Sequence, residues 1–309
     1  MMDLQTLNDN FAIDGVLRFS ASDTGLLRAH VTTPACKAEL YLQGAHLTAW
    51  QPAGHEPVIF LSERSPLAEG KAIRGGVPII FPWFGPRTST AESPRTDGPA
   101  HGFARTSEWT LAFAALAGDD LRLTLTLGPN EASRALGYSE FQLAFELTLG
   151  RELRMRLTVA NAGSAPMRFE EALHTYFTVS DAATISLNGL AQTEYIDKTD
   201  DMQRKMQQDA TLRLTAWTDR LYLNTAATVT LDDPGFGRRI TVAKSHSNST
   251  VVWNPWAELS AKMADMTAEN WRSMTCIETV NAAENAVLLQ PTETHTMEAH
   301  VLVQALPTA

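Results

Sequence analysis

A histidine stands in the middle of a segment with the pattern of a β-strand, FEEALHTYFTVSD, residues 169–181. Side chains alternate between the two faces of a strand, so Phe169, Leu173 and Phe177 share one face, while Glu170 and His174 share the other. An imidazole with its ordinary pKa near ~6.5 can give and take a proton at neutral pH. We expect Glu170 to raise the pKa of His174 and to keep that proton available. A histidine on the open surface of a sheet explains the pattern equally well.

A single carboxylate stands among apolar side chains in MTCIETVN, residues 274–281. Met274, Cys276, Glu278 and Val280 share one face of the expected strand. Burying a carboxylate is costly unless it is hydrogen-bonded or has a shifted pKa, which makes Glu278 a candidate general base. The alternative is a structural glutamate held in an ion pair. One histidine and one glutamate would together suffice for proton transfer in both directions.

Two motifs flank a long polar stretch that runs from Pro86 to Gly102. RGGVPIIFPWFGP, with Arg74 at its start, precedes the stretch, and HGFAR, with His101 and Arg105, follows it. Loops of this length inside a compact domain are usually functional rims or disordered segments, and the flanking motifs favour a rim. Taken singly, Arg74 is more often a surface charge, and a strand histidine such as His101 is more often a hydrogen-bonded structural residue.

Composition and motifs disfavour several classes of function. The formal net charge of −10 argues against nucleic acid and anionic membranes as partners, because the field would repel both. We find no nucleotide-binding, metalloprotease or hydrolase motif and no clustered His/Cys spacing, so we expect neither a cofactor nor a metal. Cys36 and Cys276 are expected to be buried, reduced thiols. Without a leader-like start or a bilayer-length apolar run, we expect a cytoplasmic protein.

Strict alternation of apolar and polar residues predicts three strands separated by short turns, at residues 121–127, 141–149 and 153–159. A hairpin is expected over residues 228–242, with a turn rich in Asp, Pro and Gly. Helical patterns are confined to residues 129–136 and 255–266. The sequence therefore predicts an all-β chain, with residues 1–309 forming one domain: a large antiparallel β-sandwich with a few short helices.

Six motifs occur in the order found in the aldose 1-epimerase superfamily: RGGVPIIFPWFGP, HGFAR, ALHTYFTVSD, TDRLY, VVWNPW and CIET. Together they span residues 74–278 and resemble most closely the hexose-6-phosphate mutarotase branch, the glucose-6-phosphate 1-epimerase-like proteins. The resemblance implies the galactose mutarotase-like form of the β-sandwich. It also implies an isomerase of carbohydrate metabolism that needs no cofactor and takes a small sugar phosphate. We expect a monomer.

Carried over to this sequence, the resemblance makes His174 the general acid and Glu278 the general base. His101 and Asp219 match positions that contact the sugar. The implied reaction interconverts the α and β anomers of a hexose 6-phosphate by ring opening and closure. Two alternatives remain open at this point. One is a mutarotase for free aldoses such as galactose or glucose, and the other is a non-catalytic sugar-binding module on the same fold.

The resemblance also points to the groups that would hold a phosphate. Arg74 and Arg105 match the positive groups associated with it, and a guanidinium suits a phosphate because it gives bidentate, charge-assisted hydrogen bonds. This sequence departs from the family after FG, where relatives often place a basic residue and where it has Pro86, Arg87 and a long Ser/Thr-rich loop. Arg87 is therefore a candidate substitute for that basic residue.

Overall fold

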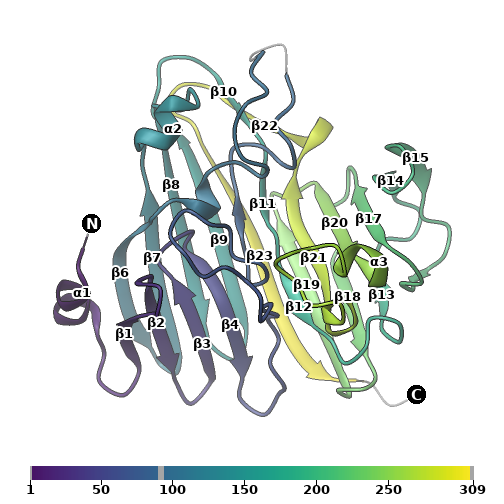
Figure 1. Cartoon of the computed structure of the whole chain (residues 1–309), viewed down its shortest axis with the longest axis horizontal. Coiled ribbons are helices and arrows are strands. Elements are labelled where there is room, and N and C mark those ends of the chain that lie inside the picture. Colours follow the sequence, from purple (N-terminus) through teal and green to yellow (C-terminus); the bar gives the residue numbers. More distant parts are fainter. Residues whose placement is uncertain (1, 90–93, 307–309) are drawn as a thin grey trace.

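The computed structural model describes residues 2–89 and 94–306, and it consists mainly of antiparallel strands in large sheets (Figure 1). Residues 90–93, part of the polar stretch predicted to form a rim, lie outside the described residues. Within the described ranges, three sheets account for most strands, and a small pair joins β10 (Met167–Phe169) to β22 (Val287–Leu289). The predicted all-β fold class is confirmed.

One layer is a nine-stranded antiparallel sheet. In spatial order its strands are β16 (Thr211–Leu212), β13 (Ser186–Asn188), β18 (Val229–Asp233), β19 (Arg238–Ser245), β23 (Thr294–Ala305), β9 (Leu153–Asn161), β8 (Phe141–Leu149), β7 (Asp120–Leu127) and β6 (Thr110–Ala117). The three strands predicted from alternation are β7, β8 and β9, and each pairs antiparallel with the next. The predicted hairpin is β18 and β19, which is closed where Asp233 pairs with Arg238.

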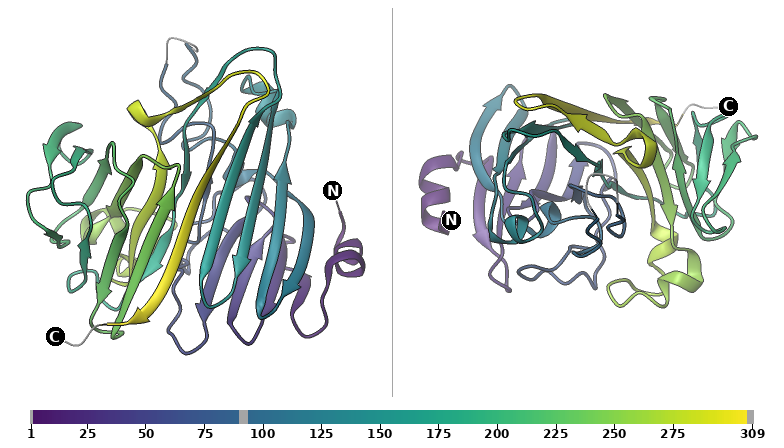
Figure 2. Two further views of the ribbon diagram at one scale, coloured as in Figure 1. Left: turned by 180° about the vertical axis from the view of Figure 1, so that it is seen from behind. Right: turned by 90° about the horizontal axis from the view of Figure 1, so that it is seen from above.

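The second layer consists of two sheets that lie over the nine-stranded sheet (Figure 2). The first is an N-terminal meander of β1 (Leu17–Ala21), β2 (Leu27–Thr32), β3 (Cys36–Tyr41) and β4 (His46–Pro52). The second has, in order, β15 (Gln203–Met206), β14 (Glu194–Asp197), β17 (Thr218–Tyr222), β20 (Ser249–Asn254), β21 (Met274–Asn281), β11 (Glu171–Leu173) and β5 (Ile79–Ile80), with β12 (Tyr176–Thr178) paired to β21. An isolated bridge between Leu47 and Val77 links β4 to the segment just before β5.

Apolar side chains from both layers meet in one buried core. Leu123 of β7 and Phe145 of β8 belong to the same buried cluster as Trp50 of β4 and Phe177 of β12. The strands of the nine-stranded sheet alternate between buried and exposed positions, because only one of their faces is covered. The predicted β-sandwich is confirmed. The assignment of residues 1–309 to one domain stays a prediction.

The helices are short. They are α1 (Leu4–Phe11), α2 (Glu131–Ala135) and α3 (Trp256–Ser260), with 3-10 turns η1 (Ala104–Thr106), η2 (Asn270–Ser273) and η3 (Ala283–Asn285). α2 and α3 lie within the two segments predicted to be helical, whereas α1 was not predicted. Its start is capped by Asp3, whose carboxylate accepts a hydrogen bond from the backbone N–H of Thr6, and it buries only Leu7. No helix among the described residues is long and apolar enough to cross a membrane.

Residues 169–181 do not form the single strand that their alternation predicted. Phe169 ends β10, which belongs to a different sheet from β11 and β12, and a break at residues 174–175 separates these two. The predicted core face is confirmed, since Phe169, Leu173 and Phe177 all lie in the main core. The alternation therefore identified the buried face correctly, but it could not reveal that the chain changes sheet.

The break leaves the pairing register intact. β11 and β12 both pair antiparallel with β21, and they do so in one continuous register. Leu173 pairs with Thr279, so at the next position along the ladder His174 faces Glu278. Residues facing each other across antiparallel strands have Cβ atoms about 4.5–5.5 Å apart. Strand register is thus what brings these two side chains together.

A second histidine–glutamate pair joins the two layers. Glu171 of β11 is fully buried, and its Oε1 lies 2.9 Å from Nε2 of His295 on β23 and 2.9 Å from Nδ2 of Asn281. Burial acts to lower the pKa of His295, but the hydrogen bond from its ring to Glu171 and the charge of that carboxylate outweigh burial, so the pKa is raised. The pair therefore cross-links the layers as a charge-assisted hydrogen bond.

We expect His295→Ala to lower the free energy of unfolding by about 1.5–3 kcal/mol, because Glu171 loses a charge-assisted hydrogen bond. The folded pKa of His295 is raised, so this stabilisation is present below the unfolded pKa of ~6.5 and is lost as the pH rises through the folded pKa. Urea unfolding at several pH values measures both effects. His300→Ala is the control. His300 lies on β23, as His295 does, but its pair with Glu152 is more exposed. Equal losses in the two variants would contradict the assignment.

Candidate active site

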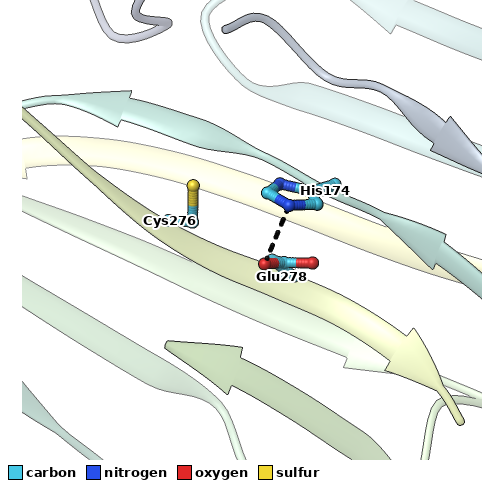
Figure 3. A group of neighbouring side chains, drawn as sticks. All are labelled: His174, Cys276 and Glu278. Atoms are coloured by element: carbon cyan, nitrogen blue, oxygen red, sulfur yellow. Dashed lines mark ion pairs between the residues drawn. The ribbon is translucent and has the colours of Figure 1, made fainter. Parts of the chain in front are cut away.

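His174 and Glu278 form a buried pair, with Nε2 of the imidazole 3.3 Å from Oε1 of the carboxyl group (Figure 3). His174 is 8% exposed and Glu278 is 1% exposed. The backbone N–H of His174 donates a hydrogen bond to the carbonyl oxygen of Pro78, which ties the break between β11 and β12 to the segment before β5. The alternative of a histidine on an open sheet surface is therefore wrong, and the two candidate catalytic residues share one environment.

Burial shifts the pKa values of the two side chains in opposite directions. It raises the pKa of Glu278 well above its ordinary value, against the opposing charge of Lys198. It lowers the pKa of His174 well below its ordinary value, and the positive groups around the ring add to this effect. A buried carboxyl group and a buried imidazole both favour their uncharged forms. In the free protein the proton of the pair therefore resides on the carboxyl group, beside a neutral imidazole.

Glu170 does not act on His174, contrary to the expectation from their shared strand face. Its carboxylate accepts hydrogen bonds from the backbone N–H groups of Phe84 and Ala283, each at 2.8 Å. The expectation that Glu170 raises the pKa of His174 is wrong. The reason is the change of sheet at Phe169, which invalidates a two-residue period across this part of the chain.

His101 reaches the pair from a turn and not from a strand. Its φ is 65°, and Gly102 follows at 69°, where a Cβ atom would lie 2.0 Å from the carbonyl oxygen of Phe81. The ring centroids of His101 and His174 are 5.6 Å apart, edge to face. Nδ1 of His101 accepts a hydrogen bond from the backbone N–H of Gly85, and burial lowers its pKa to about 3. The ring is thus neutral and carries its proton on Nε2, which makes it a hydrogen-bond donor.

Arg74 is held near the pair by two hydrogen bonds. Its Nε donates to Oδ2 of Asp265 at 2.9 Å, and its Nη1 donates to the hydroxyl of Tyr176 at 2.9 Å. Gly75 follows with a φ of 112°, and a Cβ atom there would lie 2.5 Å from the carbonyl oxygen of Phe60. Only glycine, which has no Cβ atom, allows the backbone to approach so closely here. The charge of Arg74 is one of the causes that lower the pKa of His174, so the guanidinium acts on the pair.

Arg105 carries an unused hydrogen-bond donor. Its Nη2 donates to the carbonyl oxygen of Ala100 at 2.8 Å, whereas its Nε is buried without a hydrogen-bond partner among the described residues. Burial lowers the pKa of this guanidinium. A buried cation with an unfilled donor is costly unless an anion completes it. The charge of Arg105 also lowers the pKa of His101 and of His174, so it acts on the same small region.

Asp219 and Lys198 place opposite charges near Glu278. Nζ of Lys198 lies 3.4 Å from Oδ1 of Asp219 and 4.6 Å from the ring centroid of Phe84. Burial raises the pKa of Asp219, and the charge of Asp219 in turn acts to raise the pKa of Glu278. Motifs in the sequence indicated Asp219 but not Lys198, because nothing in TEYIDKTD distinguishes this lysine from a surface residue. Only the fold brings its charge beside the carboxylates.

Arg87, the candidate substitute for a phosphate-binding residue, lies among different neighbours. Its guanidinium stacks over the ring of Trp83 at 4.5 Å and lies 5.7 Å from that of Tyr138. It donates to the carbonyl oxygen of Leu136 at 3.2 Å and lies 3.6 Å from the carboxylate of Asp97. These contacts hold the start of the long polar stretch against the end of α2. They give Arg87 a packing function at that place.

The pair has a third polar neighbour, Cys276, which the alternation of residues 274–281 placed on the same strand face as Glu278. Cys276 lies two residues before Glu278 on the same face of β21 (Figure 3). The ligand atoms of His174, Cys276 and Glu278 all lie within 4.8 Å of one another. Imidazole nitrogen, thiolate sulfur and carboxylate oxygen are all ligands of Zn²⁺ in proteins. Spacing could not reveal the group, because residues 174 and 276 are remote in the chain.

Comparison with known proteins assigns the chain to a protein family. The family model described as aldose 1-epimerase matches residues 28–301. The chain belongs to the aldose 1-epimerase family. The resemblance stated from the six motifs is therefore confirmed, and so is the predicted class of enzyme, a sugar epimerase.

Relatives in this family match along most of the chain. A protein of Escherichia coli (strain K12) named "Putative glucose-6-phosphate 1-epimerase" is 35% identical over 265 residues, which are 86% of each chain. The crystal structure of a "putative mutarotase" from Salmonella typhimurium has a TM-score of 0.86 at 33% identity and covers 96% of both chains. A galactose mutarotase-like protein from Clostridium acetobutylicum, only 13% identical, shares the fold with a TM-score of 0.70 over 94% of this chain and 98% of its own. The predicted type of β-sandwich is thereby confirmed.

We expect the imidazole of His174 to stay neutral between about pH 6 and pH 8 in the ligand-free epimerase, because burial and the surrounding positive charges lower its pKa. Ring nitrogen chemical shifts from ¹⁵N NMR measure its protonation, and comparison with His174→Asn assigns the signal. The other histidine signals provide an internal reference. A titration midpoint at or above ~6.5, the ordinary value, would contradict this assignment.

Proposed function

We propose that this epimerase is a hexose-6-phosphate mutarotase that interconverts the α and β anomers of glucose 6-phosphate or a closely similar hexose phosphate. The observation that carries the proposal is the buried His174–Glu278 pair, set within electrostatic reach of Arg74 and Arg105. A proton-transfer pair beside two guanidinium groups suits a substrate that has both a hemiacetal and a phosphate. The name of the Escherichia coli relative supports the same substrate.

The reaction requires two proton transfers, one at each of the two oxygen atoms bonded to C1. Glu278 as a carboxylate takes the proton of the anomeric hydroxyl, the bond between C1 and the ring oxygen breaks, and protonated His174 gives its proton to that ring oxygen. The product is the open-chain aldehyde. Rotation about the C1–C2 bond presents the other face of the carbonyl, and the reverse transfers close the ring as the other anomer. No proton, electron or group is consumed, so the residues return to their starting states.

The pair must change its proton arrangement before it can react. Catalysis needs ionised Glu278 and protonated His174, whereas the free protein holds the proton on the carboxyl group. Both arrangements contain the same number of protons, and they differ by the transfer of one proton across the 3.3 Å between Oε1 and Nε2. A phosphate dianion bound to Arg74 and Arg105 offsets the positive charge that lowers the pKa of His174, which favours the reactive arrangement. The substrate's own charge therefore helps to activate the pair.

Neighbouring residues bind the sugar in this proposal. His101 offers an Nε2–H donor, and Asp219 offers a carboxylate, so hydroxyl groups of a hexose find both a donor and an acceptor next to the pair. Lys198 keeps a positive charge beside Asp219 and Glu278, which favours their ionised forms. Trp253 lies with its ring centroid 6.5 Å from that of His174, where an indole can pack against an apolar sugar face.

His174→Ala and Glu278→Gln are each expected to slow anomer exchange by ~10²–10⁴-fold, the usual range for loss of a general acid or base. Magnetisation-exchange NMR on an equilibrium mixture of glucose 6-phosphate anomers measures the rate directly. His300→Ala and Glu152→Gln are matched controls, because they remove the same residue types from a more exposed pair. If His174→Ala and Glu278→Gln exchange the anomers as fast as the unaltered protein, these residues are not the general acid and base. An absence of exchange with the unaltered protein would remove the proposed function.

Arg105→Ala is expected to lower kcat/KM for glucose 6-phosphate relative to that for glucose by about 10- to 150-fold, equivalent to the ~1.5–3 kcal/mol of a hydrogen bond to a charged group. The reason is that its buried Nε has no partner within the described protein and suits a phosphate oxygen. Arg156→Ala on the exposed face of β9 is the control. Arg87→Ala tests the candidate indicated by the sequence and is expected to leave the ratio unchanged.

Comparison of the two sugars also distinguishes the alternative functions. Equal efficiencies of the unaltered enzyme on glucose and glucose 6-phosphate would favour a mutarotase for free aldoses. Equal losses for both sugars in Arg105→Ala would show that this arginine does not hold the phosphate. Binding of sugar without any exchange would favour a non-catalytic module.

A further inference from the structure

Cys276 is the polar neighbour of the pair for which the proposed reaction has no use. It is completely buried, and it shares a cluster with Tyr176 and Met274. A buried free cysteine usually behaves as a small apolar residue, and burial raises the pKa of this thiol well above its ordinary value. The thiol is therefore a poor nucleophile, and its position beside a histidine and a carboxylate suggests a different chemistry.

The three side chains have the geometry of a metal-binding group. Cys276 and Glu278 project from one face of β21, and His174 faces Glu278 from the adjacent strand positions (Figure 3). Their ligand atoms lie within 4.8 Å of one another. The 3.3 Å between Nε2 of His174 and Oε1 of Glu278 matches the separation of two ligands bound tetrahedrally at ~2.0–2.1 Å from a Zn²⁺ ion.

Two of the three side chains have buried polar atoms without partners. Nδ1 of His174 and Oε2 of Glu278 make no hydrogen bond within the described protein, although both residues are more than nine-tenths buried. Unsatisfied buried polar atoms are uncommon and indicate strain, function or a missing ion. These two atoms are not the ones that face each other across 3.3 Å, so the position of the ion is set by the grouping of the three side chains within 4.8 Å.

Charge balance also favours a divalent ion. A thiolate and a carboxylate neutralise the two positive charges of the ion, and an imidazole nitrogen binds as a neutral ligand. Asp219 adds negative charge nearby, while Arg74 and Arg105 oppose the ion. The thiolate therefore has to supply much of the affinity, which selects thiophilic ions over Mg²⁺ or Ca²⁺.

We propose that His174, Cys276 and Glu278 form a binding site for Zn²⁺ or a similar thiophilic divalent cation, and that the bound ion inhibits the enzyme. Binding releases the thiol proton of Cys276 and the carboxyl proton of Glu278 to solvent, and the remaining tetrahedral position is open to water. Inhibition follows because the ion occupies the acid and the base at once. The inhibition rests on the proposed mutarotase function, whereas the binding does not.

Cobalt provides a direct test of binding. Tag-free protein titrated with Co²⁺ is expected to show a thiolate-to-cobalt charge-transfer band and the visible bands of a tetrahedral site, and added Zn²⁺ should displace both. Cys276→Ser is expected to lose the charge-transfer band. Cys36→Ser is the matched control, because Cys36 lies on β3 in the N-terminal sheet and should keep it. Absence of the band in the unaltered protein, or its persistence in Cys276→Ser, would overturn the proposal.

Kinetics then tests inhibition. Zn²⁺ is expected to slow anomer exchange of glucose 6-phosphate, with substrate competing and a chelator restoring the rate. Each variant is compared with its own metal-free rate, and Cys276→Ser and Cys276→Ala are both expected to need at least ~10-fold more Zn²⁺ for half inhibition. If these variants and the unaltered enzyme are equally sensitive to inhibition by Zn²⁺, the proposed site is wrong. Absence of exchange without metal would instead refute the mutarotase function, while the cobalt spectrum would still report binding.

Discussion

The removal of one histidine–carboxyl pair from water is the physical constraint on which the site depends. Burial disfavours the charged form of each side chain, so His174 and Glu278 favour a neutral imidazole beside a protonated carboxyl group over two separate ions. A reaction that returns to its starting state needs such a pair, because each group must both give and take a proton. The same side chains in water would be a carboxylate and a partly protonated imidazole with little influence on each other.

The fold creates this environment by covering both faces of one strand. All eight residues of β21 are buried, since the strand lies inside the eight-stranded sheet between β20 and the β11–β12 ladder. A polar pair in such a place is costly unless a ligand can reach it, and the break between β11 and β12 falls at His174 itself. Turns that need glycine, such as Gly102 after His101, bring further polar groups to the same place. Regular strands alone would have filled it with apolar side chains.

Two histidine–glutamate pairs in this protein show how surroundings decide function. His295 and Glu171 also meet across β-strands, but there the carboxylate is the dominant charge near the ring, and the pKa of His295 is raised. His174 faces His101 and two guanidinium groups, and its pKa is lowered. The first pair is suited to holding two layers together as ions. The second is suited to moving a proton, and its positive surroundings fit an anionic substrate while they oppose the cation that its three ligand atoms could bind.

The sequence by itself determined five strands of the nine-stranded sheet, β7, β8, β9, β18 and β19, the buried face of residues 169–181 and the identities of the acid and base candidates. These features depend on local alternation or on motifs, which survive without knowledge of the fold. Tertiary structure alone decided that residues 169–181 change sheet and that Glu170 binds backbone N–H groups. It also decided that Arg87 packs on Trp83, that Lys198 lies beside the pair, and that His174 meets Cys276 and Glu278. The physical reason is that a pKa depends on burial and on charges within a few ångströms, and strand register between remote segments decides which charges those are.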